Sequence, residues 1–184
     1  AADQLGDWLW ENRARWIVPR LGVREALAAG EAEGKFPIFL ADHADNTGGG
    51  APGDSTEILQ AFRDWKLRDA LLLYLVDTEV VAQAHAVGVG GRIHTLLGGK
   101  SSPVQGPPLE VDAEVVALSD GAFAYDGPMF AGLTGNMGKS AWIRFDDGIS
   151  VVVVTKREQP LDPAFARTLG IDVRRMKYVC VKSA

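Results

Sequence analysis

Three side chains that could bind a metal ion or transfer a proton lie close together in the sequence: Asp42, His43 and Asp45. They follow a short apolar run, residues 36–40, which predicts a buried strand, and open α/β sheets bind their ligands at the carboxyl ends of strands. Neighbouring residues of an extended segment point to opposite sides. Only Asp42 with Asp45, or His43 with Asp45, could therefore converge, and a complete metal site would need further ligands from elsewhere.

A glycine-rich segment, residues 47–53, comes next and reads TGGGAPG. Its composition allows positive φ angles and a close approach of the backbone, as in loops that bind phosphates. Gly48 and Gly53 have the spacing of a P-loop, but Asp54 occupies the position of the P-loop lysine and would repel a nucleotide's phosphates. The glycine pattern of dinucleotide-binding loops is incomplete as well. The sequence therefore argues against nucleotide binding here.

Two interpretations of this loop remain open on the residues alone. In the first, the loop binds a small ligand or cation, or faces a catalytic cleft. The candidate residues for that role are Asp42, His43, Asp45, Asn46, Gly48, Gly49, Gly50 and Asp54. In the second, the loop is structural and Asp54 caps a helix that begins near residue 55, with Glu57 at the capping-box position.

The other groups with chemical potential are expected to be structural. His85 and His94 lie in a predicted helix and a predicted strand, where a histidine usually makes a structural contact. Cys180 lies in an apolar run, which predicts a buried small hydrophobe rather than a nucleophile. Lys100 follows two glycines and could meet an anion, although a solvated loop lysine is the commoner case. Because neither a G-x-S-x-G nor an H-E-x-x-H motif occurs, the chain shows no complete catalytic set.

Length and composition bound the class of protein. The chain has 184 residues and is 47% hydrophobic, so we expect a single domain over residues 1–184. A formal charge of −5 and dispersed lysines and arginines argue against nucleic acid or a membrane surface as the partner. A single cysteine excludes an internal disulfide framework. Since we find no apolar run of membrane-spanning length and no signal peptide, we expect a cytoplasmic protein.

The hydrophobic pattern predicts an α/β fold with a mixed sheet. Strand–helix units with parallel strands form the N-terminal part, and an antiparallel, hairpin-rich second half follows. Strands are expected at residues 36–40, 70–76, 91–97, 111–117, 141–145, 149–155 and 176–182. Helices are expected at residues 5–16, 24–29, 55–65, 78–87 and 162–169, with Gly30 ending the second and Asp77 beginning the fourth.

The first expected helix is unusually rich in tryptophan. Leu5, Trp8, Leu9 and Trp16 recur at helical spacing and share one face. We expect this face to pack in the core of the domain, with a partner protein as the alternative. Trp10 is rotated by about 200° from Trp8, so it should be partly exposed and could serve as an interface anchor.

A family resemblance is carried by residues 45–56, DNTGGGAPGDST. This segment resembles the signature D-N-P-G-G-G-x-P-G-D-x-T of the C-terminal domain of the microcystinase C (MlrC)-like metallopeptidases. Further segments follow in the family's order: AVGVG (86–90), LGGK (97–100), GPPL (106–109), SDGAF (119–123), QPLDP (159–163), LGID (169–172) and VKS (181–183). Two departures are Thr47, where the family usually has proline, and Thr78, where Asp-Pro is common.

The resemblance implies a function for the whole polypeptide rather than for this chain alone. The family's zinc ligands and catalytic residues belong to an N-terminal domain that this sequence lacks, so the resemblance implies no catalytic residue and no cofactor here. It implies a non-catalytic C-terminal domain of a zinc-dependent peptidase or amide hydrolase, with the glycine-rich loop facing the cleft. The expected partner is the catalytic N-terminal domain of the same polypeptide, and a homo-oligomer stays open. The alternative is an independent α/β module that binds a small ligand or cation at Asp42, Asp45 and the loop.

Overall fold

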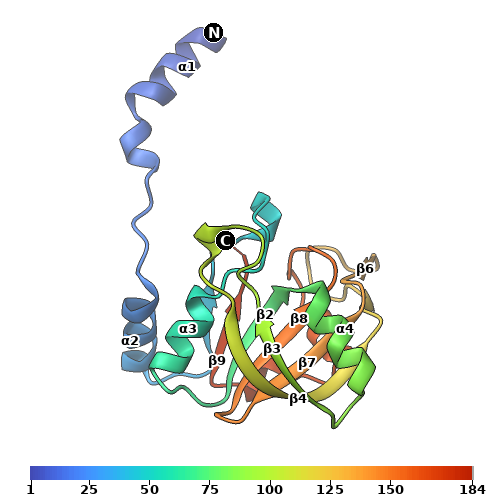
Figure 1. The fold of residues 1–184 in the computed structure, drawn as a ribbon. Helices are drawn as coiled ribbons and strands as arrows, with labels where there is room; N and C mark the ends of the chain where they lie inside the picture. Colours follow the sequence, from blue (N-terminus) through green and yellow to red (C-terminus); the bar gives the residue numbers. More distant parts are fainter. Residues whose placement is uncertain (184) are drawn as a thin grey trace.

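The computed structural model describes residues 1–183 and has a seven-stranded mixed sheet at its centre (Figure 1). The strand order is β1-β9-β2-β8-β7-β4-β3. The strands are β1 (Ile38–Ala41), β2 (Ala70–Val76), β3 (Arg92–Leu97), β4 (Leu109–Ser119), β7 (Ser140–Phe145), β8 (Ile149–Val154) and β9 (Tyr178–Val181). A separate ribbon pairs β5 (Ala122–Ala124) with β6 (Thr134–Asn136). The predicted mixed α/β fold is confirmed.

The sheet divides into a parallel and an antiparallel part. Strands β1, β9, β2 and β8 run parallel to one another, whereas β7 pairs antiparallel with β8 and β4, and β3 pairs antiparallel with β4. The last strand in the sequence, β9, lies between β1 and β2, and Tyr178 is in register with both Ile38 and Ala70. The carboxyl ends of three parallel strands that are far apart in the sequence therefore meet at one edge of the sheet.

The α-helices are α1 (Ala2–Glu11), α2 (Val23–Glu33), α3 (Glu57–Asp64), α4 (Thr78–Val87) and α5 (Ala164–Arg167). Four of the five α-helices of the described residues, α2 to α5, pack against the body of the domain. Short 3-10 turns are η1 (Arg13–Trp16), η2 (Thr47–Gly49), η3 (Pro103–Gln105) and η4 (Val173–Arg175). Among the residues described, none of these helices combines the length and the apolar character needed to cross a bilayer.

Strand β2 lies in the middle of the core. Leu72 and Leu75 pack with the buried faces of α2, α3 and α4, while Leu71 and Leu73 pack with Phe165 of α5. Burial of such a side chain contributes about 1.5–3 kcal/mol relative to exposure. The unbroken apolar run of residues 70–76 therefore reflects a strand that is buried on both faces.

Three helix details differ from the predictions. Helix α2 continues through Gly30 and ends at Glu33, and its C-cap residue, Gly34, has a φ of 65°. Gly30 instead allows close packing, because a Cβ there would lie 2.7 Å from Cγ2 of Ile38. The apolar spacing of the helix expected at residues 78–87 predicts that Val87 faces inward, but Val87 of α4 is exposed. Helix α3 begins at Glu57, two residues later than expected near 55.

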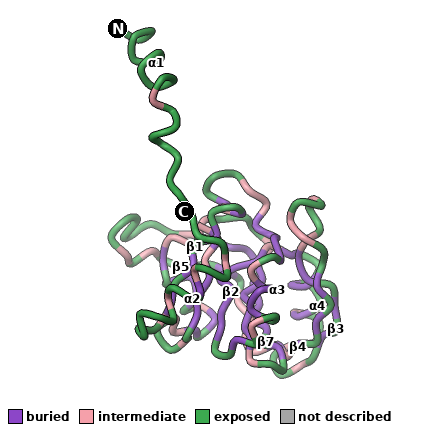
Figure 2. Tube along the Cα trace, turned by 90° about the vertical axis from the view of Figure 1, so that its left-hand side faces the viewer, coloured by how far each residue is buried: buried purple, intermediate pink, exposed green. Residues whose placement is uncertain are grey.

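The prediction that the first helix packs in the core is wrong. No residue of α1 is buried, and the helix stands away from the body on an extended segment, residues 17–22 (Figures 1 and 2). Because that segment carries α1 beyond the end of the sheet, the helix contacts none of the core elements. The expected exposure of Trp10 is confirmed, at 68%.

Candidate functional site

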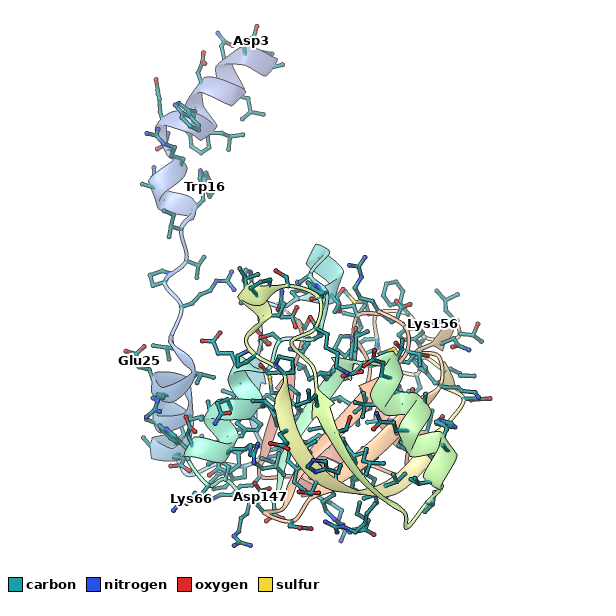
Figure 3. All side chains as sticks on the ribbon, in the orientation of Figure 1. Asp3, Trp16, Glu25, Lys66, Asp147 and Lys156 are labelled. Carbon is teal, nitrogen blue, oxygen red and sulfur yellow. The ribbon has the colours of Figure 1, made fainter. Side chains whose placement is uncertain are left out.

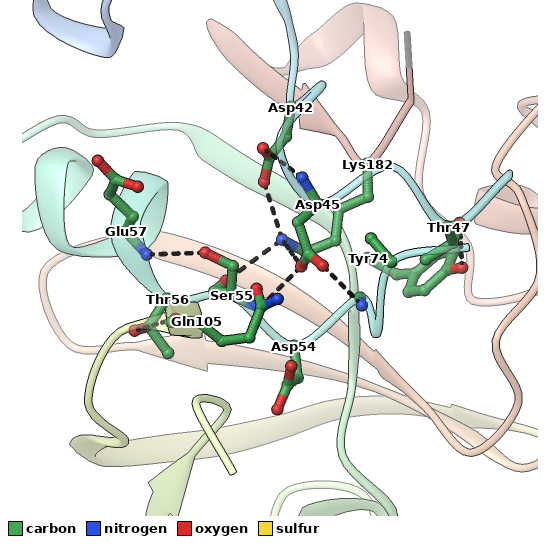
Figure 4. A network of polar contacts seen from close by, with 12 residues as sticks. Asp42, Asp45, Thr47, Asp54, Ser55, Thr56, Glu57, Tyr74, Gln105 and Lys182 are labelled. Atoms are coloured by element: carbon green, nitrogen blue, oxygen red, sulfur yellow. Dashed lines mark hydrogen bonds and ion pairs between the residues drawn. The ribbon is translucent and has the colours of Figure 1, made fainter. Parts of the chain in front are cut away.

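Asp42 and Asp45, the predicted ligand pair, converge on a cation supplied by the chain itself (Figure 4). Nζ of Lys182 lies 3.0 Å from Oδ2 of Asp42 and 2.8 Å from Oδ2 of Asp45. It also donates to the carbonyl oxygen of Ser55 at 3.2 Å. Lys182 directly follows β9 and is completely buried. Sequence analysis missed its role, and the available signal was a lysine directly after a strongly apolar strand.

The charges in this cluster stabilise one another. Burial by itself lowers the pKa of Lys182, but the adjacent Asp42 and Asp45 outweigh it, so the pKa is raised and the ammonium stays charged. All three N–H bonds of an ammonium have acceptors here. Burial of an isolated charge would destabilise the fold by several kcal/mol. The ion pairs offset this loss only when the hydrogen bonds of the buried groups are complete.

The carboxylate of Asp45 also holds the two ends of the glycine-rich loop together. Its Oδ1 accepts the N–H of Gly53 at 2.8 Å, and its Oδ2 accepts the N–H of Ser55 at 2.8 Å. Gly53 has a φ of 84°, and a Cβ there would lie 2.7 Å from Cγ2 of Thr47. Only glycine fits this position, so the loop has a defined shape.

A second anchor joins the loop to β2. The hydroxyl of Tyr74 donates to Oγ1 of Thr47 at 3.0 Å, and Thr47 donates to the carbonyl of Glu158 at 3.1 Å. The Glu158 N–H donates back to the Tyr74 oxygen at 3.1 Å. Burial raises the pKa of Tyr74 to about 12, so the phenol stays neutral. Thr47, the departure from the family signature, thus makes contacts that a proline could not.

Asp54 is a third anchor rather than a helix cap, and the predicted cap is wrong. Helix α3 has Thr56 at its N-cap, without a side-chain capping bond. Oδ2 of Asp54 accepts the N–H groups of Lys100 (2.9 Å) and Ser101 (2.8 Å), while Oδ1 accepts the Ser101 hydroxyl at 2.6 Å. Local spacing favoured a cap. It could not indicate the true partners, because they lie more than 40 residues away in the chain.

Lys100 is likewise not a solvated loop lysine, as the sequence had favoured. Its Nζ lies 3.0 Å from Oδ2 of Asp77 and 2.8 Å from Oε2 of Glu79. Partial burial lowers its pKa, but hydrogen bonds to both carboxylates outweigh this and the pKa is raised. Asp77 also accepts the Val80 N–H, which confirms its predicted place at the start of α4.

The exposed part of the loop carries no charged side chain. Gly48, Gly49 and Gly50 are all exposed, and Asn46 turns inward so that its Oδ1 accepts the Gly48 N–H at 3.0 Å. Nη1 of Arg157 donates to the carbonyl of Gly50 at 3.1 Å and holds the tip from outside. We call residues 48–50 the glycine tip.

His43 is exposed, whereas Asp42 and Asp45 are buried. It lines a groove of about 500 Å³ beside β1, together with Phe39 and Ile58. The pairing of His43 with Asp45, one of the two geometries that the sequence allowed, does not occur. Asp42 with Asp45 is the pair that forms.

The donor side chains of the described residues do not fit a zinc site. Within residues 1–183, no three His, Cys, Asp or Glu side chains are grouped so that they could hold a metal ion. Nε2 of His85 contacts the carbonyl of Ser140 at 3.2 Å, and His94 contacts Asp112 at 3.0 Å, so both histidines make structural contacts as predicted. Cys180 is completely buried, also as predicted, and burial raises the pKa of its thiol.

Comparisons of this chain with known families, sequences and structures agree with one another. The sequence model of the family described as "MlrC C-terminus" matches residues 40–184. Microcystinase C from Sphingomonas sp. is 28% identical over 149 residues, which are 81% of this chain and 28% of that protein. A metallopeptidase-like protein from Mesorhizobium sp. BNC1 matches in structure with a TM-score of 0.84 and 26% identity, over 98% of this chain and 36% of that one. The chain thus spans only about a third of these relatives, or less.

Replacement of Lys182 should be strongly destabilising. Lys182→Met keeps the apolar stem but leaves two buried carboxylates without a cation, which costs about 3–5 kcal/mol. Urea unfolding at neutral pH measures the loss. Lys35→Met, at an exposed lysine, is the matched control and should stay within about 0.5 kcal/mol of the parent. Equal stability of the two variants would contradict the role of Lys182.

Substitution of Asp54 distinguishes the observed anchor from a helix cap. Asp54→Ala leaves the Lys100 and Ser101 N–H groups without their acceptor and should cost about 1–3 kcal/mol. Asp54→Ser should cost about as much, because its shorter side chain cannot reach them. A cap would instead tolerate serine almost without loss. Thermal unfolding of the two variants decides, and a silent Asp54→Ser would restore the capping role.

Proposed function

The chain belongs to the MlrC C-terminus family, and on that premise we propose that residues 1–184 form the single, non-catalytic C-terminal domain of a zinc-dependent peptidase or amide hydrolase. Its partner is the catalytic N-terminal domain of the same polypeptide, and its glycine tip faces the catalytic cleft. The description of the Mesorhizobium relative as metallopeptidase-like supports a metal in the longer polypeptide. Zinc as that metal, and the cytoplasm as its compartment, are part of the proposal.

The observation that carries the proposal is the inward direction of three aspartates of the loop region, Asp42, Asp45 and Asp54, all of which are buried. Asp42 and Asp45 neutralise Lys182, and Asp54 accepts three hydrogen bonds from the 100–101 turn. The glycine tip therefore offers backbone amides and carbonyls but no acid, base or nucleophile. Such a tip can shape a cleft and contact a substrate's polar groups, while proton transfer and nucleophilic attack require groups from elsewhere.

The poor fit of this chain's carboxylates to a zinc site also supports a non-catalytic role. A zinc site needs three or four N, O or S ligands around one point, and the best-placed carboxylates here already share a lysine. In the proposal, the other domain would supply the zinc ligands, and zinc bound there would supply Lewis-acid chemistry. This chain would contribute the glycine tip to one side of the catalytic cleft. The independent cation-binding module would need Asp42 and Asp45 as ligands, and none of the contacts around them favours it.

Metal content tests the division of labour between the domains. Residues 1–184, purified and dialysed against a weak chelator, should retain far less than one zinc per chain and should not hydrolyse a peptide panel. The complete gene product should retain metal and hydrolyse an amide substrate. Elemental analysis and an activity assay measure both. Stoichiometric zinc in residues 1–184 would overturn the proposal.

A bulky side chain on the glycine tip tests whether it faces the cleft. A Cβ at Gly49 would have its nearest neighbour, Nδ2 of Asn46, at 3.5 Å, so the position accepts a side chain without strain. In the complete gene product, Gly49→Phe should lower kcat/KM by about 10-fold or more through misplacement of the substrate. The free energy of unfolding should change by less than about 0.5 kcal/mol.

The matched control is Arg68→Phe. Arg68 is exposed and lies just before β2, near Lys66, at the edge of the sheet opposite the tip (Figure 3). The Arg68→Phe variant adds the same aromatic surface and should leave kcat/KM unchanged. If Gly49→Phe and Arg68→Phe had the same activity as the parent, the tip would not face the cleft.

A further inference from the structure

Helix α1 and turn η1 present an apolar face that nothing in residues 1–183 covers. Leu5, Trp8, Leu9 and Trp16 are 58%, 47%, 44% and 56% exposed. The Trp8 and Trp16 rings meet edge to face, with centroids 5.7 Å apart, and form one continuous surface. We call these four residues the tryptophan face. An aromatic ring of this size buries 150–250 Å² when it docks, so two of them carry a large part of an interface.

Trp10 is on the other side of the helix and already has a local partner. At 100° per residue, Trp10 is rotated by about 150° from the centre of the tryptophan face. The guanidinium of Arg13 lies 4.3 Å from its ring centroid. The sequence had suggested Trp10 as the interface anchor, and the geometry transfers that role to Trp8 and Trp16.

The apolar surface continues from the helix to the body of the domain. Ile17, Val18 and Leu21 on the extended segment are 74%, 68% and 63% exposed. Leu21 then lines the groove beside β1, together with Phe39, which is 55% exposed. A strip of apolar side chains thus runs from the tryptophan face to the edge strand of the sheet.

The direction of α1 indicates where a partner would lie. Strands β1, β2 and β9 end at the same edge, and the glycine tip and the C-terminal end of the chain lie there too (Figure 1). Figures 1 and 2 show α1 rising beyond this edge, and Figure 3 shows Trp16 well clear of the body. A partner seated on this edge can touch the tryptophan face and the glycine tip together.

The structural relative indicates what that partner is. The match to the Mesorhizobium protein covers 98% of this chain, so it includes almost all of the N-terminal segment, yet it accounts for only 36% of that protein. A counterpart of this N-terminal segment therefore occurs within a much longer chain. The remainder of that chain is polypeptide available to cover the apolar strip.

We propose that the tryptophan face docks on the catalytic part of the same polypeptide, which sits over the carboxyl edge of the sheet between α1 and the glycine tip. Trp8 and Trp16 anchor this contact. The inference rests on the proposed function, because it takes the catalytic domain as the occupant. It adds which residues hold the two domains together and where the second one lies.

Hydrogen exchange of the α1 amides tests the docking. A helix of ten residues without tertiary contacts is marginal in water, so α1 should exchange rapidly in residues 1–184. In the complete gene product, the same amides should exchange slower by on the order of 100-fold, because the docked helix opens only with the interface. Rapid exchange of α1 in both proteins would overturn the inference.

Three variants of the complete gene product separate the two faces of the helix. Trp8→Ser and Trp16→Ser should each restore rapid α1 exchange and lower the hydrolytic rate, since they remove the anchors. Trp10→Ser removes the same ring from the opposite face and should leave both unchanged. Because α1 contacts none of the core elements, residues 1–184 should keep their melting temperature with any of the three. Loss of protection only with Trp10→Ser would overturn the assignment of the anchors.

The outcomes also distinguish this inference from the proposed function. If the complete gene product binds metal and hydrolyses amides while α1 stays unprotected, the docking is wrong and the proposed function stands. If residues 1–184 protect α1 by themselves, in proportion to a dimer measured by light scattering, the occupant is a second copy and the inference is wrong. Absence of metal and hydrolysis in the complete gene product would overturn the proposed function and, with it, the choice of partner.

Discussion

The buried ammonium of Lys182, held between Asp42 and Asp45, is the interaction on which the shape of the loop region depends. It joins the end of β9 to the end of β1, two strands separated by most of the chain. Taking these charges out of water costs several kcal/mol each unless every hydrogen bond is made. The Ser55 carbonyl and the Gly53 amide complete those bonds, so the charges can be buried only when the loop has its observed course. The cluster therefore couples the closing of the sheet to the shaping of the loop.

This coupling means that the aspartates near the loop already have bonding partners within the chain. Carboxylate oxygens are metal ligands only while they are available, and those of Asp42 and Asp45 already accept hydrogen bonds from the Lys182 ammonium and from backbone N–H groups. Asp54 is used in the same way by the turn at 100–101. The exposed part of the loop, the glycine tip, is backbone, and the buried contacts of the flanking residues fix its position.

The elements that were predicted well are those whose signals are local. An unbroken apolar run predicts strand β2, and the turn residues 146–148 predict the β7–β8 hairpin. Asp77 at the capping position predicts the start of α4. Contacts between distant parts of the chain could not be found in this way. The partners of Asp54 and of Lys182 come from segments about 46 and 140 residues away, and local spacing had offered a nearer role for Asp54. The amphipathic pattern of α1 likewise indicated an apolar face without indicating what covers it.

Position 47 shows that the shape of the loop, rather than the chemistry of one side chain, is what the fold maintains. The signature that this chain resembles has a proline there, whose ring restricts φ and removes an N–H donor. Thr47 lacks the ring, but its hydroxyl is held between the Tyr74 hydroxyl and the Glu158 carbonyl. A covalent restraint and a hydrogen-bonded one are different ways to fix the entry of the same loop. Because Thr47 is buried, neither residue would offer a reactive group to a substrate, and the constraint that both satisfy is the placement of the glycine tip.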